Sequence, residues 1–226
     1  MSEAAYLVTG ASRGIGAAIA RKLAAPGRLI AINFLASDAE AATVAADVEA
    51  KGARALLLKA DVTRPEEVEA MFAKLPAEGL AGLVCNAGAP PRYGRLHETT
   101  PEEFERQWRS QAYASALCCR QALPPMLKRK AGRIVFVVSA VAESRPPSFL
   151  GAYVSAKYAL LGLAKALEAE AGPRGVKVSC VFPRMTDTAF IKDFPRPIVE
   201  EAAEFQGGLD SPAMAAERVA AALEAA

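Results

Sequence analysis

The sequence has 226 residues, of which 52% are hydrophobic and 23% are charged, and its formal net charge is +2. This length suits one folded domain with a substantial core. The small net charge argues against a nucleic-acid-binding protein, whose surface needs a clustered excess of basic residues. No apolar run approaches the ~20 residues that a membrane span needs, and the first residues lack a signal-peptide pattern. We therefore expect a cytoplasmic protein that binds neither nucleic acid nor membrane.

The cysteines and the single histidine show no catalytic or metal-binding pattern. No pair of cysteines has the C-x-x-C spacing, and two adjacent cysteines are poorly placed to share one metal ion. The four cysteines are Cys85, Cys118, Cys119 and Cys180. We expect reduced, structural thiols in apolar surroundings, no metal site, and a surface or packing position for His97.

Short apolar segments alternate with longer helical segments along the chain. In chain order, the predicted strands are 5–9, 29–33, 55–59, 82–85, 133–138 and 177–181. The predicted helices are 15–25, 37 to about 52, one from 63, 100 to about 130, 151–171 and one from 211 to the C-terminus. The helix starts at Ser37, Thr63 and Thr100 carry the S/T-x-x-E sequence of a capping box.

This order of elements predicts the fold class. Strands without strict alternation of apolar and polar residues, separated by helices, are typical of a parallel sheet covered on both faces. We predict a single α/β domain over 1–226, with a Rossmann-like, doubly wound parallel sheet and helices on both faces.

The stretch 188–210 departs from the regular pattern. It mixes aromatic and aliphatic side chains with Pro195 and Pro197. Two interpretations are open: a mobile lid over a substrate site, or an irregular packed excursion. We favour the lid, because long loops in compact domains are often functional.

The first predicted strand ends in a glycine-rich turn, Thr9-Gly10-Ala11-Ser12-Arg13-Gly14-Ile15-Gly16. Glycines at such a turn allow the backbone to approach a pyrophosphate, and the next helix offers it unpaired N–H groups. The spacing is G-x-x-x-G-x-G, and a tight turn of this kind also occurs without a ligand. Its place after the first strand favours dinucleotide binding.

The end of the second predicted strand bears on the choice between NAD and NADP. An acidic side chain there accepts a hydrogen bond from the ribose 2′-hydroxyl and repels a 2′-phosphate. This sequence has Asn33 at that place, with Asp38 as the nearest acid, and Arg13 in the glycine turn. The pattern favours NADP(H), although Arg13 also fits a solvated loop residue.

A tyrosine and a lysine four residues apart form the second constellation. Tyr153 and Lys157 lie on one face of a predicted helix. A tyrosine with the ordinary pKa of ~10 is a poor acid–base catalyst at neutral pH, and a nearby ammonium is expected to lower that pKa. Such a tyrosine protonates an alkoxide formed by hydride transfer, with Ser139 able to donate to the same oxygen. Y-x-x-x-K pairs also arise by chance.

Together these motifs resemble the short-chain dehydrogenase/reductase family over nearly the whole chain. The residues that match its catalytic set are Ser139, Tyr153 and Lys157, with Gln111 in place of the family's asparagine. Those that match its cofactor-binding segments are Gly10, Ser12, Arg13, Gly14, Ile15, Gly16, Asn33, Asp61, Val62, Asn86, Ala87, Gly88, Tyr153, Lys157, Pro183, Thr186 and Thr188. The resemblance implies hydride transfer between NAD(P)H and a carbonyl or alcohol. It also implies a homotetramer or homodimer with long helices at the interface.

Within the family, the sequence most resembles the 3-oxoacyl-(acyl carrier protein) reductases. This implies a carbonyl substrate such as a 3-oxoacyl thioester. It also implies that Lys130 and Arg174 lie near the active-site mouth, where an acidic carrier protein would dock. Two ordinary solvated charges are the alternative interpretation of these residues.

The sequence departs from the family pattern at several places. Gln111 replaces an asparagine, Arg184 follows the proline where a glycine is usual, and Cys85 replaces the first Asn of N-N-A-G. The sequence also ends with a helix, in place of the last strand of typical members. A non-catalytic NADP-binding sensor or partner subunit on the same fold is the alternative to an enzyme. Retention of Ser139, Tyr153 and Lys157 favours the enzyme.

Overall fold

Six parallel strands form the sheet of the computed structural model, which describes residues 4–143 and 147–224. The strands are β1 (Ala4–Val8), β2 (Arg28–Phe34), β3 (Arg54–Lys59), β4 (Gly82–Cys85), β5 (Gly132–Val137) and β6 (Val176–Val181). Their order across the sheet is β3-β2-β1-β4-β5-β6. The strand order reverses between β1 and β4, which places a crevice beyond the carboxyl ends of these two strands. The predicted Rossmann-like fold is confirmed.

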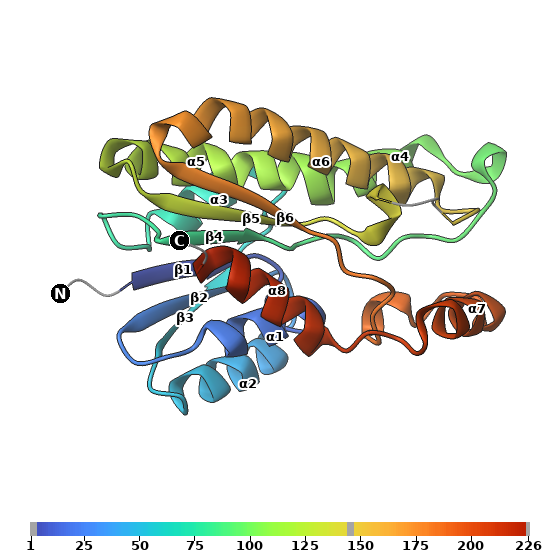
Figure 1. Ribbon diagram of the computed structural model, residues 1–226, viewed down its shortest axis with the longest axis horizontal. Coiled ribbons are helices and arrows are strands. Elements are labelled where there is room, and N and C mark those ends of the chain that lie inside the picture. The colour runs from blue at the N-terminus through green and yellow to red at the C-terminus, as the bar shows by residue number, and fades with distance from the viewer. Residues whose placement is uncertain (1–3, 144–146, 225–226) are drawn as a thin grey trace.

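Two layers of helices cover the sheet (Figure 1). One face carries α1 (Gly14–Leu23), α2 (Asp38–Glu49) and α8 (Pro212–Glu224). The other face carries α3 (Pro65–Phe72), α4 (Pro101–Trp108), α5 (Ala114–Arg129) and α6 (Gly151–Ala171). The 3₁₀ turns are η1 (Leu96–Glu98), η3 (Ala140–Ala142), η4 (Gly172–Arg174) and η5 (Ala189–Ile191). A further helix, α7 (Arg196–Gln206), projects beyond the carboxyl ends of the strands.

Each face of the sheet is buried in its own apolar cluster. In β5, Ile134 and Phe136 pack under α5 and α6, whereas Val135 and Val137 pack with α1 and α8. Because both faces exclude water, the strand needs apolar residues at consecutive positions. This explains why the strands show no polar alternation.

The buried cysteines belong to the first of these clusters. Cys85, Cys118 and Cys119 are at most 3% exposed, and all four cysteines are free thiols. A hydrogen bond with Cys85, together with burial, holds the pKa of Cys119 well above its ordinary value. Unreactive structural thiols result, as the sequence predicted. In residues 4–143 and 147–224 no group of three or more His, Cys, Asp or Glu side chains is placed to hold a metal ion.

The predicted helix starts agree with the structure only in part. The Thr100 hydroxyl accepts a long hydrogen bond from Glu103 N at 3.4 Å, and so caps α4. Thr63 does not cap α3: its hydroxyl donates to Asp61 Oδ1 at 2.8 Å, and the helix begins at Pro65. Arg64 occupies the N-cap position, so the helix starts one residue later than a capping box at Thr63 requires.

The long helix predicted from Thr100 to about Lys130 is interrupted in its first half. A π-helical turn, η2 (Arg109–Tyr113), separates α4 from α5. Pro124 and Pro125, where a kink was expected, lie inside α5. Single π-helical turns occur frequently at functional sites, and this one places Gln111 in the interior.

Residues 188–210, which we call the flap, contain η5 and α7. None of the side chains of 187–209 is buried. The base of the flap is fastened by a parallel bridge between Thr186 and Asp210, both of which are buried. The flap is therefore a surface excursion with a fixed base, and its movement as a lid stays a prediction.

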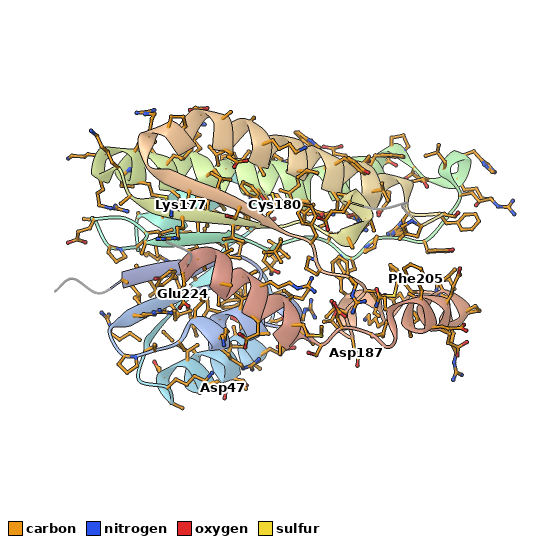
Figure 2. The ribbon with its side chains drawn as sticks, in the orientation of Figure 1. Asp47, Lys177, Cys180, Asp187, Phe205 and Glu224 are labelled. Atoms are coloured by element: carbon orange, nitrogen blue, oxygen red, sulfur yellow. The ribbon has the colours of Figure 1, made fainter. Side chains whose placement is uncertain are left out.

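Lys130 and Arg174 lie at the opposite edge of the sheet from the flap. Lys130 ends α5 just before β5, and Arg174 stands just before β6, so both are at the amino ends of these strands. Figure 2 labels Lys177 near this end of β6, whereas α7 lies at the other end. The expectation that these two residues border the active-site mouth is wrong for the single chain.

No helix of the described residues is both long and apolar enough to cross a membrane.

Candidate active site

A cleft of about 1860 Å³ runs along the carboxyl ends of the strands. Its lining extends from the glycine turn at Ser12, past Gly88, to Tyr153 and the flap at Phe190. Pockets for one drug-sized molecule typically measure roughly 300–1,000 Å³. The cleft therefore has room for a dinucleotide together with a second small molecule.

The glycine turn is held against the end of β4 by hydrogen bonds. The Thr9 hydroxyl accepts from the backbone N–H groups of Asn86 and Ala87, at 2.9 and 3.0 Å. The Asn86 amide donates to Thr9 O and Gly10 O, at 2.9 and 3.2 Å. These bonds fix the two segments that flank the crevice, so the cleft is preformed on this side.

Two glycines are required by this close contact. Gly10 has a φ of +63°, and a Cβ there would lie 3.0 Å from Ala87 Cα. A Cβ on Gly16 would lie 2.3 Å from Gly10 O. The turn leaves the start of α1 open to the cleft, where backbone N–H groups and the positive end of the helix dipole suit a pyrophosphate. These residues fit a dinucleotide.

Asn33 has a bracing role that the sequence did not reveal. Its Oδ1 accepts from Gly10 N at 3.2 Å, and its Nδ2 donates to Leu58 O and Ala60 O at 3.2 and 3.1 Å. The residue is 2% exposed. The side chain is thus used within the protein, and the positions that face the cleft after β2 are Leu35 and its neighbours.

The remaining residues at this end lie where the sequence predicted a cofactor site. Those that line the cleft are Ser12, Arg13, Gly14, Ile15, Asp61 and Val62. Arg13 is exposed, so its guanidinium is available to a ligand. One oxygen of Asp61 accepts from the backbone and hydroxyl of Thr63, which orients the carboxylate at the wall of the cleft.

Ser139, Tyr153 and Lys157 come together at the other end of the cleft. Ser139 follows β5, and the other two lie on the first turns of α6. Lys157 Nζ donates to Val137 O at 3.0 Å and lies 5.6 Å from the centroid of the Tyr153 ring. The predicted triad is thus assembled on two rigid elements.

Burial dominates the ionisation of this triad. Burial raises the pKa of Tyr153 above its ordinary value, although a hydrogen bond with Ser139 acts to lower it. Burial also lowers the pKa of Lys157 to about 7. The expectation that the lysine lowers the tyrosine pKa is therefore not met, because removal from water disfavours both charged forms.

Gln111 ends a ladder of buried polar side chains. Gln111 Nε2 donates to Gln107 Oε1 at 2.7 Å, and Gln107 Nε2 donates to Glu103 Oε1 at 3.1 Å. Although burial raises the pKa of Glu103, hydrogen bonds from Arg106, Gln107 and the backbone of Arg92 outweigh it and lower the pKa.

The ladder leaves one acceptor open. Among the described residues Gln111 Oε1 has no hydrogen-bond partner, although Gln111 is fully buried. A Cβ on Gly88 would lie 3.8 Å from this oxygen, and Gly88 lines the cleft. A buried acceptor without a donor is rare in folded proteins, so its place beside the cleft points to a functional use.

Arg184 and Asp210 fasten the base of the flap. Arg184 forms a two-pronged ion pair with Asp210, which is 4% exposed. Nearby, Pro183, Thr186 and Thr188 line the cleft as predicted. The arginine that departs from the family pattern thus has a structural partner 26 residues away.

A protein-family model described as short chain dehydrogenase matches residues 4–197. The chain belongs to the short-chain dehydrogenase/reductase family. A 3-oxoacyl-[acyl-carrier-protein] reductase of Staphylococcus aureus is 34% identical over 179 residues, which are 78% of this chain and 72% of that protein. An NADPH-dependent aldehyde reductase-like protein of Arabidopsis thaliana, described as chloroplastic, is 32% identical over 208 residues, which are 86% and 77% of the two chains.

Solved structures of the family agree with this assignment. An angucycline C-6 ketoreductase, LanV, with bound NADP superposes with a TM-score of 0.86 at 32% identity, over 98% of this chain and 89% of that chain. A dehydrogenase/reductase from Sinorhizobium meliloti 1021 gives the same TM-score and identity, over 97% and 87% of the chains. As a short-chain dehydrogenase/reductase, this chain is an NAD(P)-dependent oxidoreductase acting on CH–OH and C=O groups. The alternative of a non-catalytic sensor or partner subunit is not supported.

Proposed function

We propose that the protein reduces a ketone to an alcohol with NADPH, with Tyr153 as the proton donor. The observation that carries this proposal is the presence of Ser139, Tyr153 and Lys157 in the same cleft as the glycine turn. When bound, the nicotinamide ring supplies the hydride that converts the carbonyl carbon to a carbinol.

The chain's own groups handle the proton. The raised pKa of Tyr153 keeps its phenol protonated at neutral pH, which suits a donor to the strongly basic alkoxide oxygen. Ser139 is hydrogen-bonded to the same phenol, and stabilises the phenolate left after the transfer. Lys157 has a pKa of about 7, so its protonated and neutral forms are about equally populated at neutral pH. It is therefore able to return a proton to Tyr153.

The adenosine end of the cleft supports NADPH over NADH. Asp38 is the nearest acid after β2, and it is paired with Lys59 at 2.7 Å and does not line the cleft. Leu35 lines the cleft and is 62% exposed. Arg13 would therefore meet a ribose 2′-phosphate without a competing carboxylate from the end of β2.

Two substitutions distinguish the residue that affects the choice between NADPH and NADH from the residue that stabilises the glycine turn. Leu35→Asp should lower the NADPH to NADH ratio of kcat/KM by at least about tenfold, because a carboxylate at this position repels a 2′-phosphate. Asn33→Asp should instead lower the free energy of unfolding by about 3 kcal/mol, because a buried carboxylate faces two carbonyl oxygens. Cofactor kinetics and chemical denaturation measure the two effects. A wild-type preference for NADH would contradict the assignment of Arg13.

We propose further that Gln111 Oε1 accepts a hydrogen bond from a water that connects Lys157 with solvent. Gln111→Ala should lower kcat by about tenfold, the effect of one buried hydrogen bond, and change the KM for NADPH less. Gln111→Asn should keep substantial activity, because its amide offers the same donor and acceptor groups.

The pH profile of kcat tests whether Gln111 acts through proton return. Gln111→Ala should flatten or shift the limb that reports Lys157, whereas Gln121→Ala on α5 should leave the profile unchanged. An alanine variant as fast as wild type at every pH would remove Gln111 from the proton path.

The overall proposal is tested by steady-state assays of the pure protein with uncharged ketones, 3-oxoacyl thioesters and quinones, each with NADPH and NADH. Alcohol formed in step with NADPH oxidation supports it. The absence of turnover with every compound, in a protein that binds NADPH, would refute it. Self-association and docking of an acyl carrier protein stay predictions. A carrier bound at Lys130 and Arg174 would face away from the cleft of the same subunit.

A further inference from the structure

The substrate end of the cleft is lined by aromatic rings from separate segments. Phe190, on the flap, lies 6.1 Å from the Tyr153 ring at an angle of 59°. Tyr93, from the loop after β4, lies 5.3 Å from Phe149 and 6.2 Å from Phe194, at 54° and 51°. All five rings line the cleft. The catalytic tyrosine thus stands beside a set of tilted ring faces and edges.

Phe149 is held in the cleft by a strained backbone. Its φ is +66°, in the left-handed region that bulky residues rarely adopt, and its carbonyl accepts from Gly94 N at 2.9 Å. Phe149 is nevertheless 44% exposed. Such strain costs about 1–3 kcal/mol and clusters at ligand-binding sites, where the surrounding structure maintains it. Burial in the core does not account for this ring, which stands in the lining of the cleft where a bound molecule would meet it.

The lining also carries slightly more free carboxylates than free cations. The acidic residues of the lining that follow Ser139 in the sequence are Glu143, Asp193, Glu201 and Glu204. The basic residues there are Lys157, Arg184, Lys192 and Arg218, but Arg184 is paired with Asp210 and burial lowers the pKa of Lys157 to about 7. Glu201 lies near enough to Tyr93 to add to the effect of burial in raising its pKa. This balance disfavours a substrate with several negative charges.

We propose that these rings select an uncharged ketone fused to, or next to, a flat aromatic ring system, in preference to an anionic acyl thioester. This inference rests on the proposed ketone reductase function. Offset and edge-to-face ring contacts contribute about 0.5–1.5 kcal/mol each beyond the burial of area. A rigid ring system also loses less conformational entropy on binding than a flexible acyl chain.

A matched pair of ketones tests the selection for aromatic rings. 2-Tetralone and 2-decalone share two fused six-membered rings and the carbonyl position, and differ in whether one ring is aromatic. Wild-type kcat/KM with NADPH should be about tenfold higher for 2-tetralone, as expected for two ring contacts. Phe149→Leu and Phe194→Leu should each reduce this ratio by roughly threefold or more.

Phe72→Leu is the matched control for these variants. Phe72 ends α3, packs half-buried against the core and is not one of the residues that line the cleft. Its substitution should leave the ratio of the two ketones unchanged. A ratio near one in wild type, or a ratio that no ring variant alters, would overturn the inference while leaving ketone reduction established.

A second pair tests the role of charge. The acetoacetyl thioester of N-acetylcysteamine is uncharged, whereas acetoacetyl coenzyme A carries phosphates. At low salt the uncharged thioester should have the higher kcat/KM, and added salt should narrow the difference. Preference for the coenzyme A ester would overturn the inference. No NADPH oxidation with any of the four compounds would overturn the proposed function and this inference with it.

Discussion

Tyr153→Phe is expected to lower kcat for ketone reduction by about 10³-fold, within the range that a positioned general acid contributes. The substitution removes the phenol oxygen that is hydrogen-bonded to Ser139 and leaves the ring against Phe190. The fold and the Kd for NADPH should stay close to those of wild type, because the substitution removes only one oxygen atom from the side chain. Single-turnover rates and NADPH fluorescence titration measure the two quantities.

Tyr158→Phe provides the control on the same helix. Tyr158 lies five residues further along α6 and is 47% exposed. The same chemical change there should leave kcat unaltered. If Tyr153→Phe kept near-normal turnover, the proton donor would have to be another group, and the proposed mechanism would be wrong.

Lys157→Met is expected to lower kcat and weaken NADPH binding, and to change the pH dependence of stability. Burial depresses the pKa of Lys157 to about 7 from an ordinary value of 10.5. Below about pH 7 Lys157 is protonated in the folded protein, and the buried ammonium lowers the free energy of unfolding by its full amount. Between about 7 and 10.5 the unfolded chain binds more protons, so the stability of wild type rises with pH.

The methionine variant should therefore be more stable than wild type, by about 2 kcal/mol near pH 6, when both lack cofactor. The difference should shrink as pH rises to about 10. Chemical denaturation at several pH values measures it, with Lys165→Met, an exposed residue of α6, as the control. If the difference in free energy of unfolding between the two proteins did not vary with pH, burial would not depress the pKa of Lys157.

The sequence predicted the parts of the fold that depend on local patterns. All six strands lie within one or two residues of their expected bounds, and α6 spans 151–171 as expected. Apolar runs and glycine turns carry this information because each strand is buried on both faces. Helix α7 was missed, because Arg196–Gln206 buries no residue and its prolines, Pro195 and Pro197, were interpreted as part of an irregular stretch.

The sequence predicted which residues belong to the functional site, but not the hydrogen bonds and ion pairs that they form. Motif spacing placed Tyr153 and Lys157 together, because a helix brings residues four apart onto one face. The bracing of Gly10 by Asn33 and the ion pair of Arg184 with Asp210 join residues 23 and 26 positions apart. Only tertiary structure determines such partners, and it also determines the burial that reverses the expected pKa shift of Tyr153.

Transfer of deuterium tests the central claim most directly. The pure protein is incubated with 2-tetralone and NADPH that carries deuterium at both C4 positions of the nicotinamide, and the alcohol is analysed by mass spectrometry and NMR. We predict one deuterium on the carbinol carbon, with the hydroxyl hydrogen derived from solvent and with formation almost abolished in Tyr153→Phe. Oxidation of the cofactor without a deuterated alcohol, or equal formation by Tyr153→Phe, would contradict the assignment of this cleft as a ketone reductase site.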